Sequence, residues 1–485
     1  MTKQSLSVCS IPCAIVVLVL PLYSFVFGAS SKPAARSTSA QPSQEKQEGN
    51  LAALKKTLAD VEAEKGADHR DLIPILTAIG LAYRKQGGYV LALPFCQRAT
   101  QIAEKAGGGD SLELAAALDF LGTIYRLAGH EQSALEQYYR ALPVVRKHLG
   151  TEHPAYGILL SNQASAEMAV GKTDEALKAL REAARVVDDA YGQASQDATY
   201  VKEILGELYL RIGRFSAAED ELQYALTVRS EGLDGLYAGA IPKEETLYNI
   251  APVENLLGRL YTVVGLYDKA EPHLHNALSA FETKLGNHHP ALESVLVNLA
   301  ALAEARSDAA RAAEYQERAR QIHARNVGFS FAPATLLATA IQAAPAESPR
   351  GLFVDSRVGD WVVRGDKKGR PMERQELVRK TALVAVLRHS WWQREEKQWS
   401  PGTERIVDLT ATHADLFGET TSNPTTKRIS IKGAKLTCVA AVAESDGKKC
   451  TRYFAPGEIV PLGGLVRIEC DGDVLFQVID YHRGK

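Results

Sequence analysis

The feature that most constrains this chain is a pattern that recurs every 42 residues through its first two thirds. A small residue, which follows leucine in most copies, marks each repeat at Gly80, Gly122, Ala164, Gly206, Gly258 and Ala300. Every step between these positions is 42 residues, except one of 52 residues before the fifth copy. Self-similarity at such a period indicates a solenoid, in which each supersecondary unit buries its apolar face against the next.

Further columns of the repeat predict that each unit is a helical hairpin. Tyrosine stands three residues after the small column in four copies, and alanine stands twelve and nineteen residues after it in all six. Glycine stands seven residues after it, at Gly87, Gly129, Gly171, Gly213 and Gly265. Apolar and small residues at spacings of three, four and seven on both sides of a glycine predict two amphipathic helices joined by a tight turn. The small columns would let the two helices approach closely.

The combination of Leu-Gly-x-x-Tyr with the later glycine and alanines resembles the tetratricopeptide repeat. That repeat has about 34 residues. The longer repeat here, with the joints Leu149–Pro154 and Leu285–Pro290, is similar to the kinesin light chain type, which has a Gly-x-x-His-Pro joint. The resemblance covers about residues 51–325. It implies an all-α superhelical solenoid of about six repeats with an N-terminal cap.

Two copies depart from the columns. The third has Gln163 and Glu167 where leucine and tyrosine are expected, and the sixth has Ala303 and Ser307 where tyrosine and glycine are expected. Because terminal repeats are often atypical, we expect the sixth to be a cap.

The strand-like region after the repeats has a different character. Short β-branched runs separated by turn signals such as Asp446-Gly447 predict a small, mostly antiparallel β domain, either a sandwich or a barrel. Three cysteines lie in it, Cys438, Cys450 and Cys470, and a disulfide among them is possible in an exported protein without the pairing being fixed. An Asp446-Gly447 hairpin would place Cys450 opposite Ala443.

The N-terminus predicts export. Lys3 precedes an apolar run that includes Ile11–Leu20, and small residues follow, which is typical of a signal peptide, although an uncleaved anchor is the alternative. We therefore expect an exported protein, periplasmic or at the cell surface of a bacterium. The predicted division is residues 1–29 signal peptide or anchor, 30–50 disordered tether, 51–325 repeat solenoid, 326–351 Ala/Pro-rich linker and 352–485 β-rich domain.

The sequence offers little catalytic chemistry. With 56 Lys plus Arg against 58 Asp plus Glu, its charge argues against a nucleic-acid partner. It has no Gly-x-Ser-x-Gly, His-Glu-x-x-His, phosphate loop or Cys-x-x-Cys motif. His153, His288 and His289 repeat at a joint and predict a structural turn. We expect no metal, no cofactor and no enzyme activity.

The resemblance implies that the first helices line a concave groove that binds extended peptides. In kinesin light chain-like repeats, an asparagine just before the Leu-small pair holds the peptide backbone, and Asn162 and Asn298 match that column. The predicted partner-binding residues are Arg84, Asp119, Thr123, Arg126, Asn162, Glu203, Glu207, Asn255, Arg259 and Asn298.

These features favour a non-catalytic scaffold that binds peptide segments of partner proteins. The alternative is an envelope-associated protein whose β domain binds glycan or peptidoglycan through aromatics such as Trp391, Trp392 and Trp399. An enzyme with its site among the histidines of the β domain is a weaker alternative.

Overall fold

The computed structural model describes residues 44–234, 243–325 and, with gaps, 357–482. The gaps within the last range are 359, 366–369, 382–383, 394–397, 409–424, 432–433, 446–447, 455–464 and 471–472. The predicted signal segment and linker therefore lie outside the described residues. The chain divides into two units, one of Met1–Leu208, Glu221–Thr262 and Tyr267–Leu336, and one of Tyr209–Asp220, Val263–Leu266 and Leu337–Lys485.

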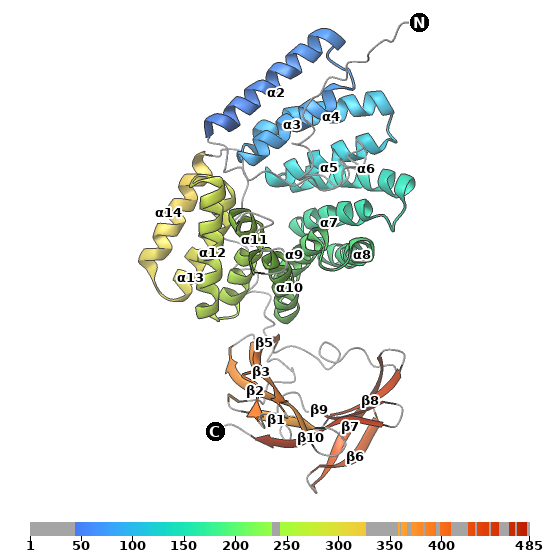
Figure 1. The fold of residues 1–485 in the computed structure, drawn as a ribbon, viewed down its shortest axis with the longest axis vertical. Coiled ribbons are helices and arrows are strands. Elements are labelled where there is room, and N and C mark those ends of the chain that lie inside the picture. The colour runs from blue at the N-terminus through green and yellow to red at the C-terminus, as the bar shows by residue number, and fades with distance from the viewer. Residues whose placement is uncertain are drawn as a thin grey trace. The chain divides into compact units, whose positions relative to one another are not determined.

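The described residues contain thirteen helices followed by an antiparallel sheet (Figure 1). The helices are α2 Gln44–Lys65, α3 Leu72–Lys85, α4 Tyr89–Gly107, α5 Leu112–Leu127, α6 Glu131–Leu149, α7 Pro154–Ala169, α8 Thr173–Tyr191, α9 Gln196–Arg211, α10 Phe215–Asp234, α11 Lys243–Val263, α12 Tyr267–Leu285, α13 Ala291–Ala305 and α14 Ala309–Arg325. α2 begins seven residues before Leu51, inside the stretch predicted to be a tether. From α3 onward the helices form six consecutive pairs, which we number repeats 1 to 6. No helix among the described residues combines the length and apolarity needed to cross a bilayer.

The glycines of the seventh column end the first helix of each pair. Gly87 has φ +75°, and the next amide, of Gly88, donates to Tyr83 O at 2.9 Å, which closes the last turn of α3. The same bond joins His130 N to Tyr125 O and Lys172 N to Glu167 O. Glycine suits this left-handed conformation because it has no Cβ. In the sixth repeat Ser307 takes the position at φ +62°, and it is the one non-glycine residue with positive φ among the described residues.

The small column holds the two helices of a pair close together, as predicted. A Cβ at Gly122 would lie 2.8 Å from the ring of Tyr138, and one at Gly258 would lie 2.4 Å from Leu274 Cγ. The alanines of the twelfth column are buried against the same contact, with Ala134 and Ala270 at 0% exposure. Tyr138 itself is fully buried and is the largest such side chain.

Ion pairs connect the second helices of successive repeats at recurring positions. An arginine eighteen residues after the small column pairs with a glutamate of the preceding repeat in Arg98–Glu62, Arg140–Glu104 and Arg318–Glu282. Between repeats 2 and 3 the two columns are exchanged, since Arg146 takes the acidic position and Glu182 the basic one. Such exposed pairs contribute about 0–1 kcal/mol each.

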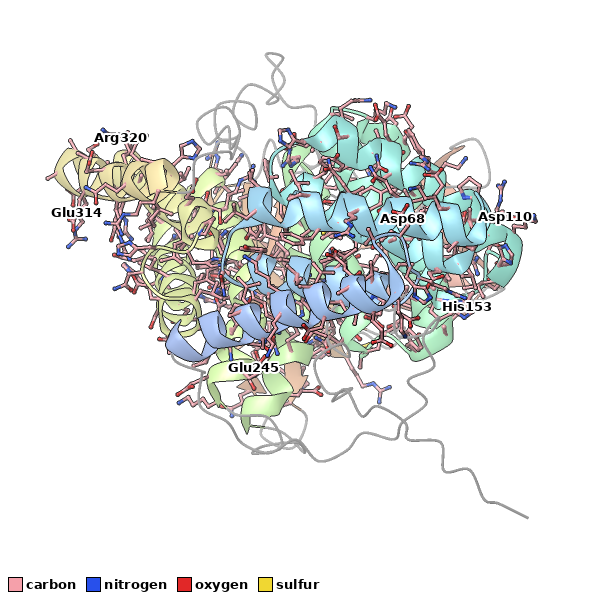
Figure 2. The ribbon with its side chains drawn as sticks, turned by 90° about the horizontal axis from the view of Figure 1, so that it is seen from above. Asp68, Asp110, His153, Glu245, Glu314 and Arg320 are labelled. Atoms are coloured by element: carbon pink, nitrogen blue, oxygen red, sulfur yellow. The ribbon has the colours of Figure 1, made fainter. Side chains whose placement is uncertain are left out.

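The joints before repeats 3 and 6 are turns built on histidine, as predicted, whereas Ser111 and Ser195 take that place before repeats 2 and 4. His153 Nδ1 accepts the Ala155 amide at 3.1 Å, and His289 Nδ1 accepts the Ala291 amide at the same distance. A neutral imidazole nitrogen thus satisfies a helix-start amide that has no partner within the helix. The first joint uses His69 in the same way, at 3.2 Å from the Asp71 amide. Figure 2 shows Asp68, Asp110 and His153, which belong to successive joints, on the same side of the view, with Glu314 and Arg320 of α14 on the other.

The first repeat contacts the joint between repeats 5 and 6. The rings of Tyr89 and His289 meet edge to face with centroids 6.5 Å apart, and a Cβ at Gly87 would lie 2.4 Å from Pro290. These residues lie in the first unit, so the repeats coil far enough for the two ends of the series to touch.

The strand region forms an antiparallel sheet with the order β4-β3-β2-β1-β10-β9-β8-β7-β6, with β5 also paired to β3. Its strands are β1 Trp361–Gly365, β2 Pro371–Lys380, β3 Val384–Gln393, β4 Gln398–Trp399, β5 Thr403–Asp408, β6 Thr425–Ile431, β7 Ala434–Ser445, β8 Lys448–Phe454, β9 Leu465–Cys470 and β10 Asp473–His482. The register places Cys450 opposite Ala443, as predicted, and on its other side opposite Cys470. The turn dipeptides Asp446-Gly447 and Asp471-Gly472 lie outside the described residues.

Candidate functional site

The predicted partner-binding residues lie on the first helices in a narrow band of columns. Asp119, Glu203 and Asn255 precede the small column by three residues, and Asn162 and Asn298 precede it by two. The remaining five follow it by one or four residues: Thr123, Glu207, Arg259, Arg84 and Arg126. Positions three and four apart share a helix face, so the repeats place these side chains in one continuous stripe.

The stripe is joined across repeats by hydrogen bonds between side chains. Asn162 Nδ2 donates to Asp119 Oδ1 at 3.0 Å, and Tyr200 donates its hydroxyl to Asn162 Oδ1 at 3.1 Å. A chain of three polar groups therefore runs from α5 through α7 to α9. Asp119 is 1% exposed, so the carboxylate depends on these partners for its solvation.

The same contact recurs at the other end of the stripe. Asn298 Nδ2 donates to Asn255 Oδ1 at 2.8 Å, and Asn255 Nδ2 donates to Ser294 Oγ at 3.2 Å. Asn255 and Asn298 are each 8% exposed. Both asparagines of the predicted peptide-holding column thus bond to the preceding repeat in this structure.

Two arginines stand in equivalent places of the first two repeats. Burial raises the pKa of Asp119 to about 6, while its bond to Asn162 and the charges of Arg84 and Arg126 oppose that shift. Arg126 Nε is buried and has no hydrogen-bond partner in the described part of the chain. Burial opposes the charged form of Arg126, but Tyr200, Tyr138 and Glu207 outweigh it and raise its pKa.

Two further predicted residues, Glu203 and Thr123, also contact other side chains. Glu203 accepts from Arg229 Nη1 at 2.7 Å, and Arg229 reaches Thr199 and the Asn249 carbonyl as well. Thr123 Oγ1 lies 3.3 Å from the Tyr138 hydroxyl. Six of the ten predicted side chains are half-buried. The other four are buried: Asp119, Asn255, Arg259 and Asn298.

Sequence reasoning missed the tyrosines and arginine that complete this stripe. Tyr200 and Arg229 lie in no conserved column of the repeat, so the period carried no signal for them. Glu254 was also missed, although it contacts His273 and accepts from Asn276 Nδ2 at 3.3 Å. Its position one residue before Asn255 could have indicated it.

In the strand region, His389 lies 3.3 Å from Glu373 Oε1, and the buried Arg364 lies 3.5 Å from the same oxygen. The pKa of Glu373 is lowered, since His389 and Arg364 outweigh its burial. His413 and Asp415 lie outside the described residues. The described residues hold no cluster of His, Cys, Asp or Glu suited to a metal ion.

The fold and the stripe define a class of protein, a series of stacked helix hairpins whose first helices carry a shared polar face. The tetratricopeptide repeat family matches residues 71–147 and 249–325. The chain is a tetratricopeptide repeat protein related to kinesin light chain-like repeat proteins, and the matched residues end before the strand region.

Three similar proteins illustrate this relationship. Protein KINESIN LIGHT CHAIN-RELATED 3 of Arabidopsis thaliana is 24% identical over 268 residues, which are 55% of this chain and 39% of that protein. The chain thus spans about two fifths of that relative. BtubC (BKLC) from P. vanneervenii has a TM-score of 0.35 at 17% identity, covering 60% of this chain and 95% of that one. The Rap conjugation gene regulator of plasmid pLS20, solved with the Phr* peptide, has a TM-score of 0.43 at 14% identity, covering 60% and 73%.

Proposed function

We propose that the solenoid is a non-catalytic scaffold that binds an extended peptide segment of a partner protein along the stripe of its first helices. The observation that supports it most is the recurrence of one contact, Asn162 to Asp119 and Asn298 to Asn255, at two places along the series. Side-chain amides can donate and accept at once, so they can exchange these bonds for bonds to the amide groups of a peptide.

The burial of the stripe sets a condition on this function. Six of the ten side chains are half-buried and can meet a peptide directly, but the four buried ones become accessible only if neighbouring first helices move apart. The contact of Tyr89 with His289 between the ends of the series is the natural place for such an opening. Peptide binding would then be coupled to a change in the pitch of the repeats, because stacked hairpins each contact only their neighbours.

Selection of a displayed random-peptide library on the full chain tests the proposal. The test variant combines Arg126→Ala, Asn162→Ala and Asn298→Ala. A matched control carries three alanine changes on the outer ion pairs, Arg140→Ala, Lys147→Ala and Arg185→Ala. We expect selected peptides to bind the control as they bind the parent, and to bind the test variant at least tenfold more weakly. Equal binding by both variants would place the site elsewhere.

The partner is expected outside the cytoplasm, because the N-terminal segment favours export to the periplasm or cell surface. Fractionation of cells that express the full chain tests this, with mass spectrometry of the N-terminus to separate a cleaved signal from an anchor. Recovery of the chain with its initial methionine in the cytoplasmic fraction would rule export out.

A second candidate function belongs to the strand region. Trp391 is 57% exposed, and beside it Trp392 and Trp399 pack edge to face with centroids 5.3 Å apart. An exposed indole next to a fixed aromatic pair suits stacking on a sugar ring. Co-sedimentation of the full chain with insoluble peptidoglycan, compared with its Trp391→Ala variant, tests this candidate. Retention that depends on Trp391 would favour the envelope-binding alternative.

A further inference from the structure

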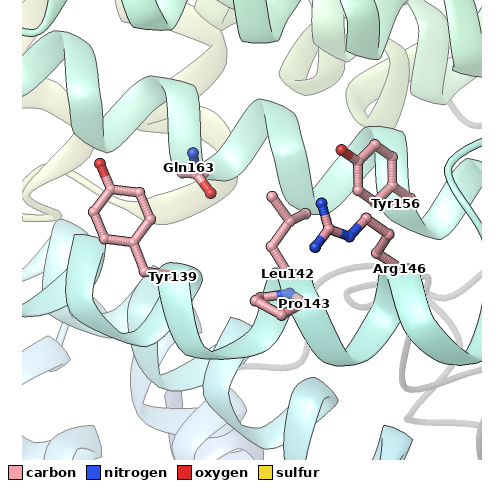
Figure 3. A pocket seen from close by; sticks show the side chains of 6 residues that line it. All are labelled: Tyr139, Leu142, Pro143, Arg146, Tyr156 and Gln163. Atoms are coloured by element: carbon pink, nitrogen blue, oxygen red, sulfur yellow. The ribbon is translucent and has the colours of Figure 1, made fainter.

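A small cavity lies where repeat 2 meets repeat 3. It has a volume of about 190 Å³ and is lined by side chains of α6 and α7: Tyr139, Leu142, Pro143, Arg146, Tyr156 and Gln163. Figure 3 shows Tyr139 and Gln163 at one end, Arg146 and Tyr156 at the other, and Leu142 with Pro143 between them. The volume lies below the roughly 300–1,000 Å³ of sites for drug-sized ligands, and it suits one side chain.

The departures from the repeat pattern gather at this cavity. Gln163 occupies a column that is leucine or isoleucine in the other five repeats, and Tyr156 occupies a column that is otherwise leucine, isoleucine or alanine. Glu167, whose carboxylate is bonded to Gln163, stands where four repeats have tyrosine. In a solenoid, stacking alone favours the consensus residue at each buried position. Several departures at one junction indicate a role other than stacking.

One of these departures exchanges the helices that carry the tyrosine and its hydrogen-bond partner. Gln97 donates to the Tyr125 hydroxyl at 2.8 Å between repeats 1 and 2, and Gln223 donates to that of Tyr261 at 3.1 Å between repeats 4 and 5. At the cavity the tyrosine is on the other helix, and Tyr139 donates its hydroxyl to Glu167 Oε1 at 3.2 Å. The exchange puts a carboxylate where these two junctions have a phenol.

The exchange leaves two buried acceptors unsatisfied. Gln163 Nε2 donates to Glu167 Oε1 at 2.8 Å, but Gln163 Oε1 and Glu167 Oε2 have no hydrogen-bond partner among the described residues. Gln163 is 8% exposed and Glu167 is 3% exposed. Burying a carboxylate without a cation in direct contact is costly. Lys172 Nζ lies 3.2 Å from the Tyr139 hydroxyl and over its ring, so its charge acts on Glu167 across that hydroxyl and without a direct ion pair among the described residues.

We propose that this cavity receives the basic side chain of a lysine or arginine from a partner polypeptide. Its N–H groups would donate to Gln163 Oε1 in the cavity wall, and its aliphatic stem would lie against Leu142 and Pro143. The carboxylate of Glu167, which is bonded to Gln163 Nε2, would supply the negative charge behind that contact. The tyrosine rings add an attraction for the cation. This site is separate from the stripe of the first helices and goes beyond the peptide binding proposed there.

The positive charge of Arg146, at the end of the cavity away from Gln163, does not prevent a basic side chain from binding. Arg146 is seven residues along α6 from Tyr139, a rise of about 10 Å. Glu182 lies near the same end, since it and Arg146 act in opposite directions on the pKa of Tyr156. A cation near Gln163 therefore meets the carboxylate of Glu167 at close range and a compensated charge at longer range.

Two probes test the site on the full chain by calorimetry or NMR titration. Nα-acetyl-lysine N-methylamide supplies the basic side chain, and the norleucine analogue supplies the stem without the charge. We expect the lysine probe to bind at least tenfold more tightly than the norleucine probe, and the Glu167→Gln variant to lose that preference. Glu152→Gln, which removes an exposed carboxylate paired with Arg185, is the matched control and should keep it.

A second variant restores the repeat consensus with Tyr139→Gln, Gln163→Leu and Glu167→Tyr. We expect it to unfold at a higher temperature than the parent and to bind neither probe. The proposal is overturned if the parent binds neither probe, binds both equally, or binds the lysine probe as well in the Glu167→Gln form. In those cases the exchange of tyrosine and carboxylate is structural. The groove proposal is unaffected, because its selection experiment leaves these residues unchanged.

Discussion

His289 accepts the backbone amide of Ala291 at the start of α13, and its ring packs edge to face against Tyr89 of the first repeat. Its Nδ1 accepts an amide and its Nε2 is buried without a hydrogen-bond partner in the described part of the chain. Burial lowers the pKa of His289 to about 4. A residue that joins the two ends of the series is therefore neutral in the folded state, although it is easily protonated once unfolded.

The stability of the solenoid should depend on pH through two opposing groups. Below about pH 6.5 the unfolded chain binds a proton at His289 that the folded chain does not, so this group lowers stability as pH falls to about 4. Asp119, with a raised pKa of about 6, binds a proton in the folded chain first, so it lowers stability as pH rises from about 4 to 6. Each effect is on the order of 3 kcal/mol.

Urea unfolding at pH 4, 5 and 6.5 separates these two effects. His289→Asn keeps an acceptor for the cap and removes the His289 contribution, so its stability should rise less between pH 4 and pH 6.5 than that of the parent. Asp119→Asn should do the reverse and steepen the gain with rising pH. His69→Asn at the exposed first joint is the control. Identical slopes in all four proteins would contradict the assignment.

Because the two helices of a repeat approach closely at the small column, we expect that replacing its glycine by alanine lowers the stability of the solenoid. Gly122→Ala would place its Cβ 2.8 Å from the ring of Tyr138. Overpacking of this kind costs about 1–3 kcal/mol, which outweighs a gain of about 1 kcal/mol in helix propensity. Gly49→Ala in α2 meets nothing within 4 Å and should show the propensity gain alone. Chemical denaturation of both variants compares the two signs directly.

The sixth repeat contains a correctable strain. Ser307 holds φ +62° where the other repeats use glycine. Ser307→Gly should stabilise the solenoid by about 1 kcal/mol, because a Cβ in the left-handed region costs about that much. Gly129→Ser, at φ +76° in repeat 2, is the reciprocal change and should destabilise by a similar amount. Thermal unfolding of both variants is the measurement. If their melting temperatures do not shift in opposite directions from the parent's, Ser307 is not strained.

The inter-repeat bonds of the stripe should contribute to stability as well as to binding. Asn298→Ala removes the donor to Asn255 and leaves a buried amide oxygen unsatisfied, which costs about 1–3 kcal/mol. Asn298→Asp keeps the shape and tests whether the donor is needed. Hydrogen exchange of α11 and α13 is the measurement, since loss of the contact should raise exchange there and leave α5 unchanged.

The period of the sequence was enough to predict the helices, their turns and the histidine joints, because each depends on residues within one repeat. The columns of Gly87, Gly122 and Ala134 act through local geometry and one nearby helix. The prediction of an antiparallel β region was also confirmed. The apolar runs marked the region as strands, whereas β2, whose sequence is PMERQELVRK, has no apolar run that would mark it by itself.

The candidate site was less accessible to prediction, because its contacts join residues about 40 positions apart. The stripe residues were named from their columns, but their pairing with Tyr200 and Arg229 arises from stacking distances that no single repeat contains. The degenerate residues Gln163 and Glu167 were noticed as departures. That Gln163 lines a cavity with Tyr139, and that Glu167 bonds to both, was visible only in three dimensions.

The exchanged charges between repeats 2 and 3 bear on how the chain avoids misassembly. Identical hairpins can dock in the wrong order, since any second helix then fits any first one. Here a hairpin shifted by one place would set Glu104 of repeat 1 against Glu182 of repeat 3, two carboxylates where Arg140 should stand. We therefore expect the exchanged charges at Arg146 and Glu182 to disfavour docking of repeat 3 in place of repeat 2 during folding.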